Sequence, residues 1–368
     1  MSRILLVSKP VAPPWNDSSK NLVRDLALGM ARHEPVVMGR RGCAVELGRA
    51  VVEPLYPQSA GGFAPALADN ARVLVRLLAG RREPLWHFFF APNARTSAVA
   101  RGAARLRRTA TVQTVCSEPR TDADPLALLF ADATVVLSRR TEQRLAGAGV
   151  PGGRLHRIPP AVPPLDVPSR AEQRRARVSF AVPEDVPLIV YPGDLELGGG
   201  ARVAVDALAA MRRADARLVL ACRRKTRAAD DAERRLRERL HASGLDGRVG
   251  FAGETARIHA LLGAADVVIL PSASLWAKMD LPLVLLEAMS MERPVVVARG
   301  TAAEELAEGG AAVAVEPRSE PLAAELDRLL DDADTRSALG RAARAHVLGH
   351  HAPSEMARAY ETLYDALL

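Results

Sequence analysis

The stretch AADVVILPSASLWAKMDLPLVLLEAMSMERPVVVA, residues 264–298, decides the fold of this chain. Its apolar run Val267–Leu270 predicts a buried strand, because parallel strands covered on both faces are continuously apolar. A helix is expected over Pro282–Met291, since proline suits the first turn of a helix. A second strand is expected at Val295–Ala298. A strand, a helix and a strand in succession indicate a parallel βαβ unit, so the sequence predicts an α/β protein.

The same alternation continues on both sides of this stretch. Near the start, a strand at Ile4–Ser8 precedes a helix at Lys20–Arg32, which Asp17, Ser18 or Ser19 would cap. Further strands in the first half are expected at Pro35–Met38, Pro84–Phe90, Thr111–Cys116 and Thr134–Leu137. The second half adds strands at Pro187–Tyr191, Ala216–Cys222, Val249–Ala252 and Ala312–Val315. Helices are expected there at Ala201–Met211, Arg227–Ser243, Glu254–Ala264, Pro321–Leu330 and Ser354–Leu368. The pattern predicts two doubly wound parallel sheets.

A proline-rich segment separates the two sheets. Residues 158–168, IPPAVPPLDVP, hold five prolines in eleven residues, which neither a helix interior nor a central strand accommodates. The length of 368 residues also fits two domains. We therefore expect a Rossmann-like domain at 1–165, completed by a C-terminal helix at 352–368, and a second one at 166–351. They are expected to face a central cleft, with ligands bound outside the carboxyl ends of the strands.

Charge is distributed unevenly along the chain. The net charge is +7. Residues 1–180 carry 27 Lys+Arg and 14 Asp+Glu, a net of +13, whereas the remainder carries 23 and 29, a net of −6. The basic half could face an anionic membrane surface or an anionic substrate. With 4% aromatic residues and no nucleic-acid-binding module, nucleic acid is the weaker interpretation.

The cysteine content and the N-terminal sequence indicate in which cellular compartment the protein is expected. Three cysteines without a C-x-x-C pair make a disulfide framework or a structural zinc site improbable. The apolar run in MSRILLVSKP is too short for a signal peptide or a membrane span. We expect a cytoplasmic protein, with peripheral contact at the inner membrane face through its basic half.

Lysine is rare, so its positions are informative. The chain has 46 arginines and four lysines. Lys9, Lys20, Lys225 and Lys278 all fall in expected strand-to-helix loops, which lie at the ligand-binding edge of such sheets. The alternative is chance placement in solvated loops.

Three segments together resemble family 4 retaining glycosyltransferases, which have the GT-B architecture. They are residues 264–298, residues 131–162 (ADATVVLSRRTEQRLAGAGVPGGRLHRIPPAV) and residues 191–211 (YPGDLELGGGARVAVDALAAM). The resemblance implies an acceptor site in the first domain and a nucleoside diphosphate sugar as donor in the second. It implies no cofactor and no metal, because an oxygen of the donor phosphate can take the acceptor's proton.

The donor site is expected at the start of the helix near Pro282. The N–H groups of Leu283 and Val284 would bind phosphate, aided by the helix dipole. Glu287, one turn further, matches the family glutamate that accepts hydrogen bonds from the ribose; the alternative is an exposed glutamate paired with Arg293. Gly193, Ser272 and Glu305 complete the predicted donor-binding set.

The family's phosphate-binding cations are missing from their usual positions. The usual glycine-arginine pair is Gly193-Asp194, the usual lysine falls at Gly199, and the first glutamate of the E-x(7)-E signature falls at Met279. Developing charge on a leaving diphosphate needs stabilisation. We therefore predict replacement catalytic residues, either from the basic run after Ala216–Cys222 or from the loop before the donor helix. The predicted cations are Arg223, Lys225 and Lys278, and Asp280 is the predicted carboxylate, shifted by one residue, in place of the first glutamate. The alternative for Arg223, Arg224 and Lys225 is a basic run on a solvated face.

Acceptor-binding residues are expected in the loops of the first domain. The loop PPWNDSSKN supplies a tryptophan for sugar stacking and polar groups at a helix start. His87 ends a very apolar strand and is equally consistent with a core histidine that has its hydrogen bonds satisfied. Cys116 stands where the family often has a histidine. The predicted acceptor-binding set is Trp15, Asn16, Asp17, Ser18, Lys20, His87, Cys116 and Ser138.

Three functions fit this sequence. The first is glycosyl transfer, with retention, to a glycan, a lipid-linked glycan or a small molecule. The second is a catalytically inactive GT-B-like binding or scaffold protein, which the residues at 194, 199 and 279 favour. The third is a sugar-nucleotide epimerase or a phosphorylase of similar architecture. The nucleotide base, sugar and acceptor are not specified by the residues.

Overall fold

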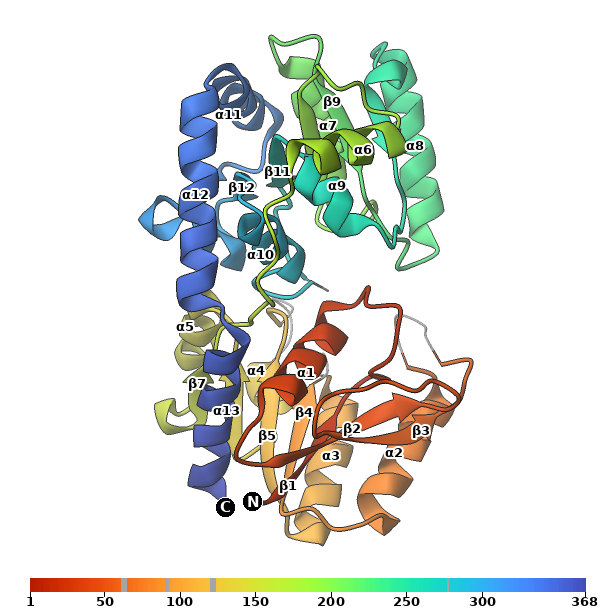
Figure 1. Cartoon of the computed structure of the whole chain (residues 1–368). Helices are drawn as coiled ribbons and strands as arrows, with labels where there is room; N and C mark the ends of the chain where they lie inside the picture. Colours follow the sequence, from red (N-terminus) through yellow and green to blue (C-terminus); the bar gives the residue numbers. More distant parts are fainter. Residues whose placement is uncertain (61–64, 90–92, 120–123, 277) are drawn as a thin grey trace. The chain divides into compact units, whose positions relative to one another are not determined.

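The computed structural model describes residues 1–60, 65–89, 93–119, 124–276 and 278–368, which divide into two compact units (Figure 1). Unit 1 comprises Met1–Pro163, Trp276–Asp280 and His351–Leu368, and unit 2 comprises Pro164–Leu275 and Leu281–His350. The first boundary lies two residues before the predicted one. The short segment Trp276–Asp280 belongs to unit 1, although the residues on both sides of it belong to unit 2.

Unit 1 is built on a parallel sheet of seven strands in the order β3-β2-β1-β4-β5-β6-β7. The strands are β1 (Arg3–Val7), β2 (Glu34–Arg40), β3 (Val51–Tyr56), β4 (Leu85–Phe89), β5 (Ala110–Val115), β6 (Ala133–Val136) and β7 (Leu155–Arg157). The helices are α1 (Ser18–Gly29), α2 (Leu67–Ala79), α3 (Ala94–Arg107), α4 (Pro125–Leu128), α5 (Arg139–Gly147), η1 (Gly152–Arg154) and the C-terminal α13 (Pro353–Leu367). The strand order reverses between β1 and β4.

Unit 2 repeats this plan with six parallel strands in the order β10-β9-β8-β11-β12-β13. The strands are β8 (Leu188–Tyr191), β9 (Arg217–Leu220), β10 (Val249–Phe251), β11 (Val267–Leu270), β12 (Val295–Ala298) and β13 (Val313–Val315). The helices are α6 (Arg170–Ser179), α7 (Gly200–Ala210), α8 (Ala228–Ala242), η2 (Asp246–Arg248), α9 (Ile258–Ala264), α10 (Leu283–Ser290), η3 (Ala302–Gly310), α11 (Ser319–Asp331) and α12 (Ala333–His350). Here the order reverses between β8 and β11.

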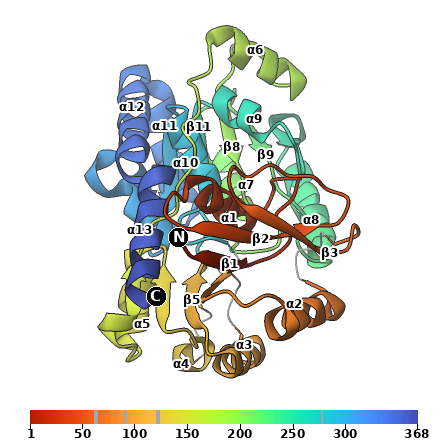
Figure 2. The same ribbon diagram turned by 60° about the horizontal axis from the view of Figure 1, so that its bottom comes forward.

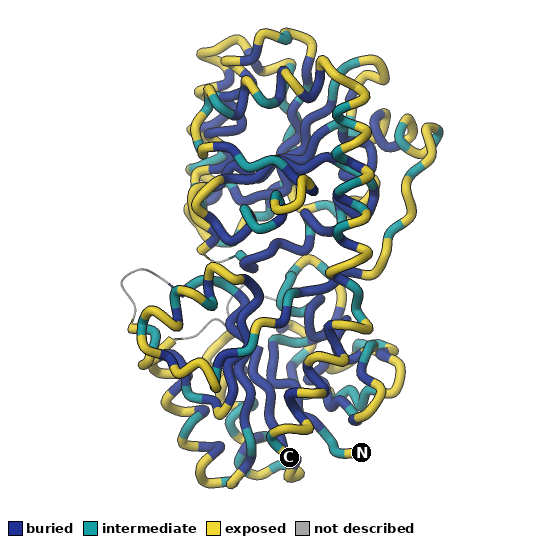
Figure 3. Tube along the Cα trace, turned by 90° about the vertical axis from the view of Figure 1, so that its left-hand side faces the viewer, coloured by how far each residue is buried: buried dark blue, intermediate teal, exposed yellow. Residues whose placement is uncertain are grey.

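Apolar strands form the core of each unit. Strands β4, β8, β11 and β12 are buried along their whole length, as expected for parallel strands covered on both faces. The burial pattern in Figure 3 shows buried strands at the centre of each unit and exposed residues on the outer faces of the helices. The predicted fold, two doubly wound parallel sheets, is confirmed.

Element ends differ slightly from the predictions. The helix after β11 begins at Leu283, and Pro282 is its N-cap with a ψ of 122° rather than its first helical residue. Asp17 is the N-cap of α1, and its carboxylate accepts a hydrogen bond from the Ser19 N–H. The predicted strand end at Phe90 lies outside the described residues, as does residue 277 within the stretch 264–298.

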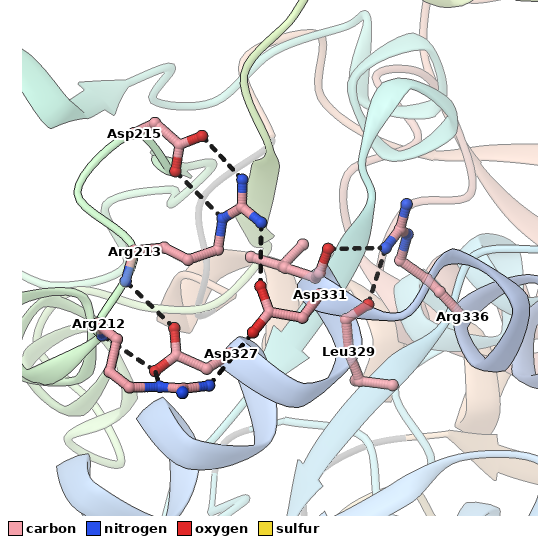
Figure 4. Close-up of polar contacts among 8 residues, drawn as sticks. Arg212, Arg213, Asp215, Asp327, Leu329, Asp331 and Arg336 are labelled. Atoms are coloured by element: carbon pink, nitrogen blue, oxygen red, sulfur yellow. Dashed lines mark hydrogen bonds and ion pairs between the residues drawn. The ribbon is translucent and has the colours of Figure 1, made fainter.

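A polar network in unit 2 ties the loop after α7 to α11 (Figure 4). The Asp327 carboxylate, 5% exposed, accepts hydrogen bonds from the N–H groups of Arg212 and Arg213 at 3.0 and 3.3 Å. Asp331 pairs with both guanidinium groups, at 3.2 and 3.1 Å. Because these contacts lie where β9 begins, they hold the amino end of the sheet and leave its carboxyl end to the site loops.

Candidate functional site

Loops at the carboxyl end of the unit 2 sheet meet where the strand order reverses. The loop after β8 and the loop after β11 flank this point, which is where open α/β sheets bind ligands. Ala273 N–H donates to the Gly198 carbonyl at 3.0 Å, so the two loops are hydrogen-bonded to each other. Both candidate donor loops therefore lie side by side in one unit.

The β8 loop folds over the hydroxyl of Tyr191. This hydroxyl is fully buried, donates to the Asp194 carbonyl at 3.0 Å and accepts from the Asp194 N–H at 3.3 Å. A Cβ at residue 193 would lie 1.9 Å from the Tyr191 ring, so only glycine fits there. Ser272 is also fully buried, with its Oγ 3.3 Å from the same hydroxyl. The prediction that Ser272 contacts the donor is wrong, because its side chain packs beneath the loop.

The glycine run before α7 has a conformational reason. Gly198 and Gly199 have φ values of +70° and +69°, in the left-handed region that other residues rarely adopt. A Cβ on Gly200 would lie 2.3 Å from Ser272 Oγ. The run is thus required by this tight turn at the start of α7, and residue 199 cannot carry the family's lysine without strain.

Asp194 and Lys225 form a buried ion pair at the ends of β8 and β9. Lys225 Nζ lies 3.0 Å from Asp194 Oδ2, and their side chains are 3% and 1% exposed. The Lys225 N–H donates to Glu196 at 3.1 Å, and a backbone bridge joins Asp194 to Arg223. The prediction that Lys225 is a cation presented to the donor is therefore corrected: its ammonium group neutralises the carboxylate that replaces the family's arginine.

The two arginines beside Lys225 have different environments. Arg224 is 60% exposed and pairs with Asp230 and Glu233 at 2.8 and 2.9 Å, so the solvated-face interpretation holds for this residue. Arg223 is half-buried and lies three residues after the end of β9. Of the basic run, Arg223 remains the candidate for contact with phosphate.

Helix α10 begins with backbone donors at the same edge of the sheet. Pro282 supplies no side-chain cap, and Leu285 and Leu286 donate back to its carbonyl. Among the described residues, none accepts a hydrogen bond from the N–H of Leu283 or Val284. Two backbone donors at the positive end of a helix can bind a phosphate group.

Glu287 lies one turn into α10 and has a partner that the sequence analysis missed. Its Oε2 lies 3.4 Å from Nε2 of His259 on α9, and the glutamate side chain is 16% exposed. The alternative partner, Arg293, instead donates to the carbonyls of Met291 and Ala265. No local signal links residues 259 and 287, because the contact depends on the packing of α9 against α10. Glu305 lies half-buried in η3.

Asp280 is directed into unit 1. Its N–H donates to the Cys116 carbonyl at 3.0 Å, and its Oδ2 accepts from Ser138 Oγ at 2.8 Å. Ser138 also caps α5 through the Thr141 N–H. Burial raises the pKa of the Asp280 carboxyl to about 6.

These buried contacts correct three predicted roles. The carboxylate of Asp280 is engaged with unit 1, so it does not replace the family's first glutamate as a group open to the donor. Cys116 and Ser138 form its docking position and are themselves buried, so neither is an open acceptor ligand. Lys278, two residues earlier, is half-buried in the same segment of unit 1.

Two lysines of unit 1 hold the loop after β1. Lys9 Nζ pairs with Asp17 at 3.0 Å. Lys20, in the first turn of α1 rather than in the loop, donates to the carbonyls of Ala12 and Pro14 at 3.1 and 2.9 Å. Asp17 and Lys20 therefore shape the loop, and their prediction as acceptor ligands is corrected to a positioning role.

The same loop presents Trp15 in a fixed position. Asn21 donates to the Trp15 carbonyl at 3.2 Å, and the guanidinium carbon of Arg24 lies 5.0 Å from the centre of its ring. The ring is half-buried, while Asn16 is exposed. Of the predicted acceptor set, Trp15, Asn16 and Ser18 remain at least partly accessible. The supporting residues Asn21 and Arg24 come from α1, so no loop motif reveals them.

His87 is a core residue of unit 1. It is fully buried, with Nδ1 2.6 Å from the Tyr364 hydroxyl and Nε2 2.7 Å from Thr114 Oγ1. Burial lowers its pKa well below the ordinary value, so the ring is neutral. The prediction of an acceptor-binding role is wrong, and the alternative of a core histidine with satisfied hydrogen bonds is confirmed.

Two Rossmann-like domains, each built on a parallel sheet whose strand order reverses once, give this chain the fold of the GT-B class. Within that class the chain resembles the glycosyl transferases group 1, whose family model matches residues 186–332. The resemblance to glycosyltransferases that the sequence predicts is confirmed.

Individual relatives agree with this assignment. The chain is 28% identical over 219 residues to an alpha-D-kanosaminyltransferase of Streptomyces kanamyceticus, a match that covers 57% of this chain and 54%, about half, of the relative's length. It is similar in structure to HepE of Anabaena in complex with UDP-glucose, with a TM-score of 0.79, 19% identity, and coverage of 99% of this chain and 100% of that one. It is also similar to sucrose-phosphate synthase of Thermosynechococcus elongatus, with a TM-score of 0.78, 20% identity, and coverage of 100% and 99%.

Metal-ligand clusters and membrane-spanning helices are both absent from the described residues. Within the ranges that the structure describes, no three His, Cys, Asp or Glu side chains are grouped so that they could hold a metal ion. In the same ranges, no helix combines the length and the apolar character needed to cross a bilayer.

Proposed function

We propose that this chain transfers a sugar, with retention, from a nucleoside diphosphate sugar to a glycan, a lipid-linked glycan or a small molecule. The observation that carries the proposal is the start of α10. Two backbone N–H groups without a described acceptor precede Glu287 by one turn, at the strand reversal of unit 2. In this proposal the two N–H groups bind the diphosphate and Glu287 contacts the neighbouring ribose. The kanosaminyltransferase similarity and the group 1 family match support this interpretation.

Each donor group has an assigned task in this proposal. The N–H groups of Leu283 and Val284 bind the diphosphate, and the helix dipole stabilises the charge that develops as the glycosidic bond breaks. Glu287 accepts hydrogen bonds from the ribose hydroxyls. Arg223 adds a cation at the end of β9, and Lys278 is the candidate cation of the segment before α10.

The acceptor belongs to unit 1 in this proposal. Trp15 stacks on a sugar ring, and Asn16 and Ser18 offer polar groups beside it. For retention, an oxygen of the donor phosphate takes the proton of the attacking hydroxyl, so no protein base is needed. Because the first unit is strongly basic, we further propose peripheral contact with an anionic membrane.

A second function has a specific observation in its favour. The position of the family's arginine holds Asp194, and the nearest lysine, Lys225, is engaged with it in a buried pair. A GT-B-like binding protein without catalysis would show this loss of free cations. It would bind nucleotide without turnover, whereas the transferase hydrolyses or transfers its donor.

Thermal-shift measurements against UDP-, GDP-, ADP- and TDP-sugars test nucleotide binding first. Glu287→Ala is expected to weaken binding of the stabilising nucleotide at least tenfold, about 1.4 kcal/mol, because the ribose loses its acceptor. His259→Ala is the matched control, since it removes the partner of Glu287 and leaves the carboxylate in place. Equal losses in both variants would show that Glu287 acts only through His259, and stabilisation by none of the nucleotides would refute the donor site.

A further inference from the structure

Helices α2 and α3 cover the same face of the unit 1 sheet. Leu77 of α2 and Ala100, Ala103 and Ala104 of α3 pack into one core cluster with residues of β1, β2 and β4. The two helices lie side by side in both ribbon views, and their outer faces point away from the sheet (Figures 1 and 2). We call the exposed residues of α2 and α3, with Arg81, Arg82 and Arg108, the α2–α3 surface.

Large apolar side chains are exposed on this surface. On α2, Leu67 and Val75 are 88% and 63% exposed, and on α3, Val99 and Leu106 are 51% and 74% exposed. On α2 the exposed residues Leu67, Ala71, Val75 and Ala79 recur every four positions, so they form one apolar stripe. A stripe of this kind on the outer face of a helix needs an explanation beyond the packing of unit 1.

The exposed charges on this surface are all positive. Residues 66–109 contain nine arginines and two acidic residues, Asp69 and Glu83, and both acidic residues are buried. Arg72 and Arg76 pair with these acids. The exposed arginines are Arg81, Arg82, Arg95, Arg105 and Arg108. Among the described residues, none of these five has an acidic partner. The surface therefore combines apolar side chains with unneutralised arginines.

We propose that the α2–α3 surface docks on an anionic lipid bilayer. Apolar side chains enter the boundary between headgroups and acyl chains, while arginines beside them contact anionic headgroups. A second copy of the chain is a poorer occupant, because it would bring two arginine-rich faces together. A nucleic acid is also disfavoured, since none of the described exposed residues of this surface is aromatic. The inference rests on the proposed function, which would place a membrane-borne acceptor near this unit.

Vesicle sedimentation tests this surface without nucleotide or acceptor. The full chain is mixed with vesicles of phosphatidylcholine alone or with about one third phosphatidylglycerol, at low and at high salt. We expect binding to the anionic vesicles only, decreasing as salt rises. Arg105→Glu combined with Leu106→Gln should lower the partition coefficient at least tenfold. Arg175→Glu combined with Val178→Gln on α6 of unit 2 makes the same changes elsewhere and should leave vesicle binding unchanged.

Each outcome decides for or against the docking surface. Equal effects of the two double variants would show that net charge alone controls binding and would overturn the assignment. The assignment would also be overturned if the wild-type chain did not bind anionic vesicles. A wild-type dimer that the α3 double variant fails to form would overturn it as well. Nucleotide affinity, measured on the same samples, tests the proposed function separately. A failure of the docking surface can therefore be told apart from a failure of the proposed function.

Discussion

At the residue scale, the Asp194–Lys225 pair is the feature that most distinguishes the candidate site of unit 2. A buried carboxylate and a buried ammonium group neutralise each other at 3.0 Å. Removing one partner from such a pair leaves the other charge uncompensated in a low-dielectric environment, which costs more than the pair itself contributes. The pair therefore fixes the loop after β8 to the loop after β9.

Asp194→Ala and Lys225→Ala should each destabilise the chain by about 3–5 kcal/mol. The double variant should cost clearly less than the sum of the two, because no buried charge remains unbalanced. Urea unfolding of the four proteins measures this coupling. Additive losses would mean that the two groups act independently.

The sequence identified these residues but not their relationship. Asp194, Lys225 and Asp280 were all recognised as departures from the family pattern or as rare residues at loop positions. Their partners come from other strands or from the other end of the chain, and packing alone brings them together. The sequence therefore predicted which loops carry these charged residues. It did not predict that Asp194 and Lys225 pair with each other or that Asp280 is buried.

Asp280 should make stability depend on pH. Its folded-state pKa of about 6 lies above the ordinary value, because burial penalises the charged form. The folded chain then binds this proton more tightly than the unfolded chain. The resulting stabilisation is fully present below about pH 4 and is lost as the pH rises through 6.

Asp280→Asn removes this titration and keeps an acceptor for Ser138. Between pH 4 and 7 the unfolding free energy of the wild type should fall by about 2 kcal/mol relative to the variant. Denaturant unfolding at unit pH steps measures the difference. If the unfolding free energies of the two proteins changed in parallel with pH, the raised pKa of Asp280 would be contradicted.

At the element scale, the central strands were predicted well, whereas the edge strands β3 and β7 and one long helix were not. Continuous apolar runs such as Val267–Leu270 identify buried parallel strands directly. Helix α12 was missed because its buried residues, Gly340, Ala343 and Val347, are small and give weak apolar periodicity. A Cβ on Gly340 would lie 2.3 Å from the Glu292 carbonyl, so the small residue allows α12 to approach the end of α10.

Asp327 should stabilise unit 2 by fixing the start of β9 to α11. Asp327→Ala removes the acceptor of two backbone N–H groups and should cost about 1–3 kcal/mol, since these donors lie in a partly buried place. Asp331→Ala removes only exposed ion pairs and should cost less than about 1 kcal/mol. Chemical unfolding of both variants measures the two losses of stability. Equal losses would argue against a special role for the hydrogen bonds that Asp327 accepts from the backbone.

At the scale of the whole molecule, both units are discontinuous in sequence. The chain passes between units after residues 163, 275, 280 and 350. The C-terminal helix α13 is fixed to unit 1 by Glu361, 3% exposed, which accepts from the N–H groups of Ala31, Arg32 and His33 at 3.0, 2.6 and 3.0 Å. Unit 1 thus depends on a helix that is separated from the rest of the unit by the sequence of unit 2.

Each unit has its own sheet and core, so calorimetry is expected to resolve two cooperative transitions. A nucleotide that binds α10 stabilises only unit 2, by about 2.7 kcal/mol at one hundred times its Kd, and should raise one transition alone. Glu361→Ala should lower the other, because three N–H groups lose their acceptor. If one transition responded to both changes, the units would unfold together, and binding at unit 2 would then stabilise unit 1 as well.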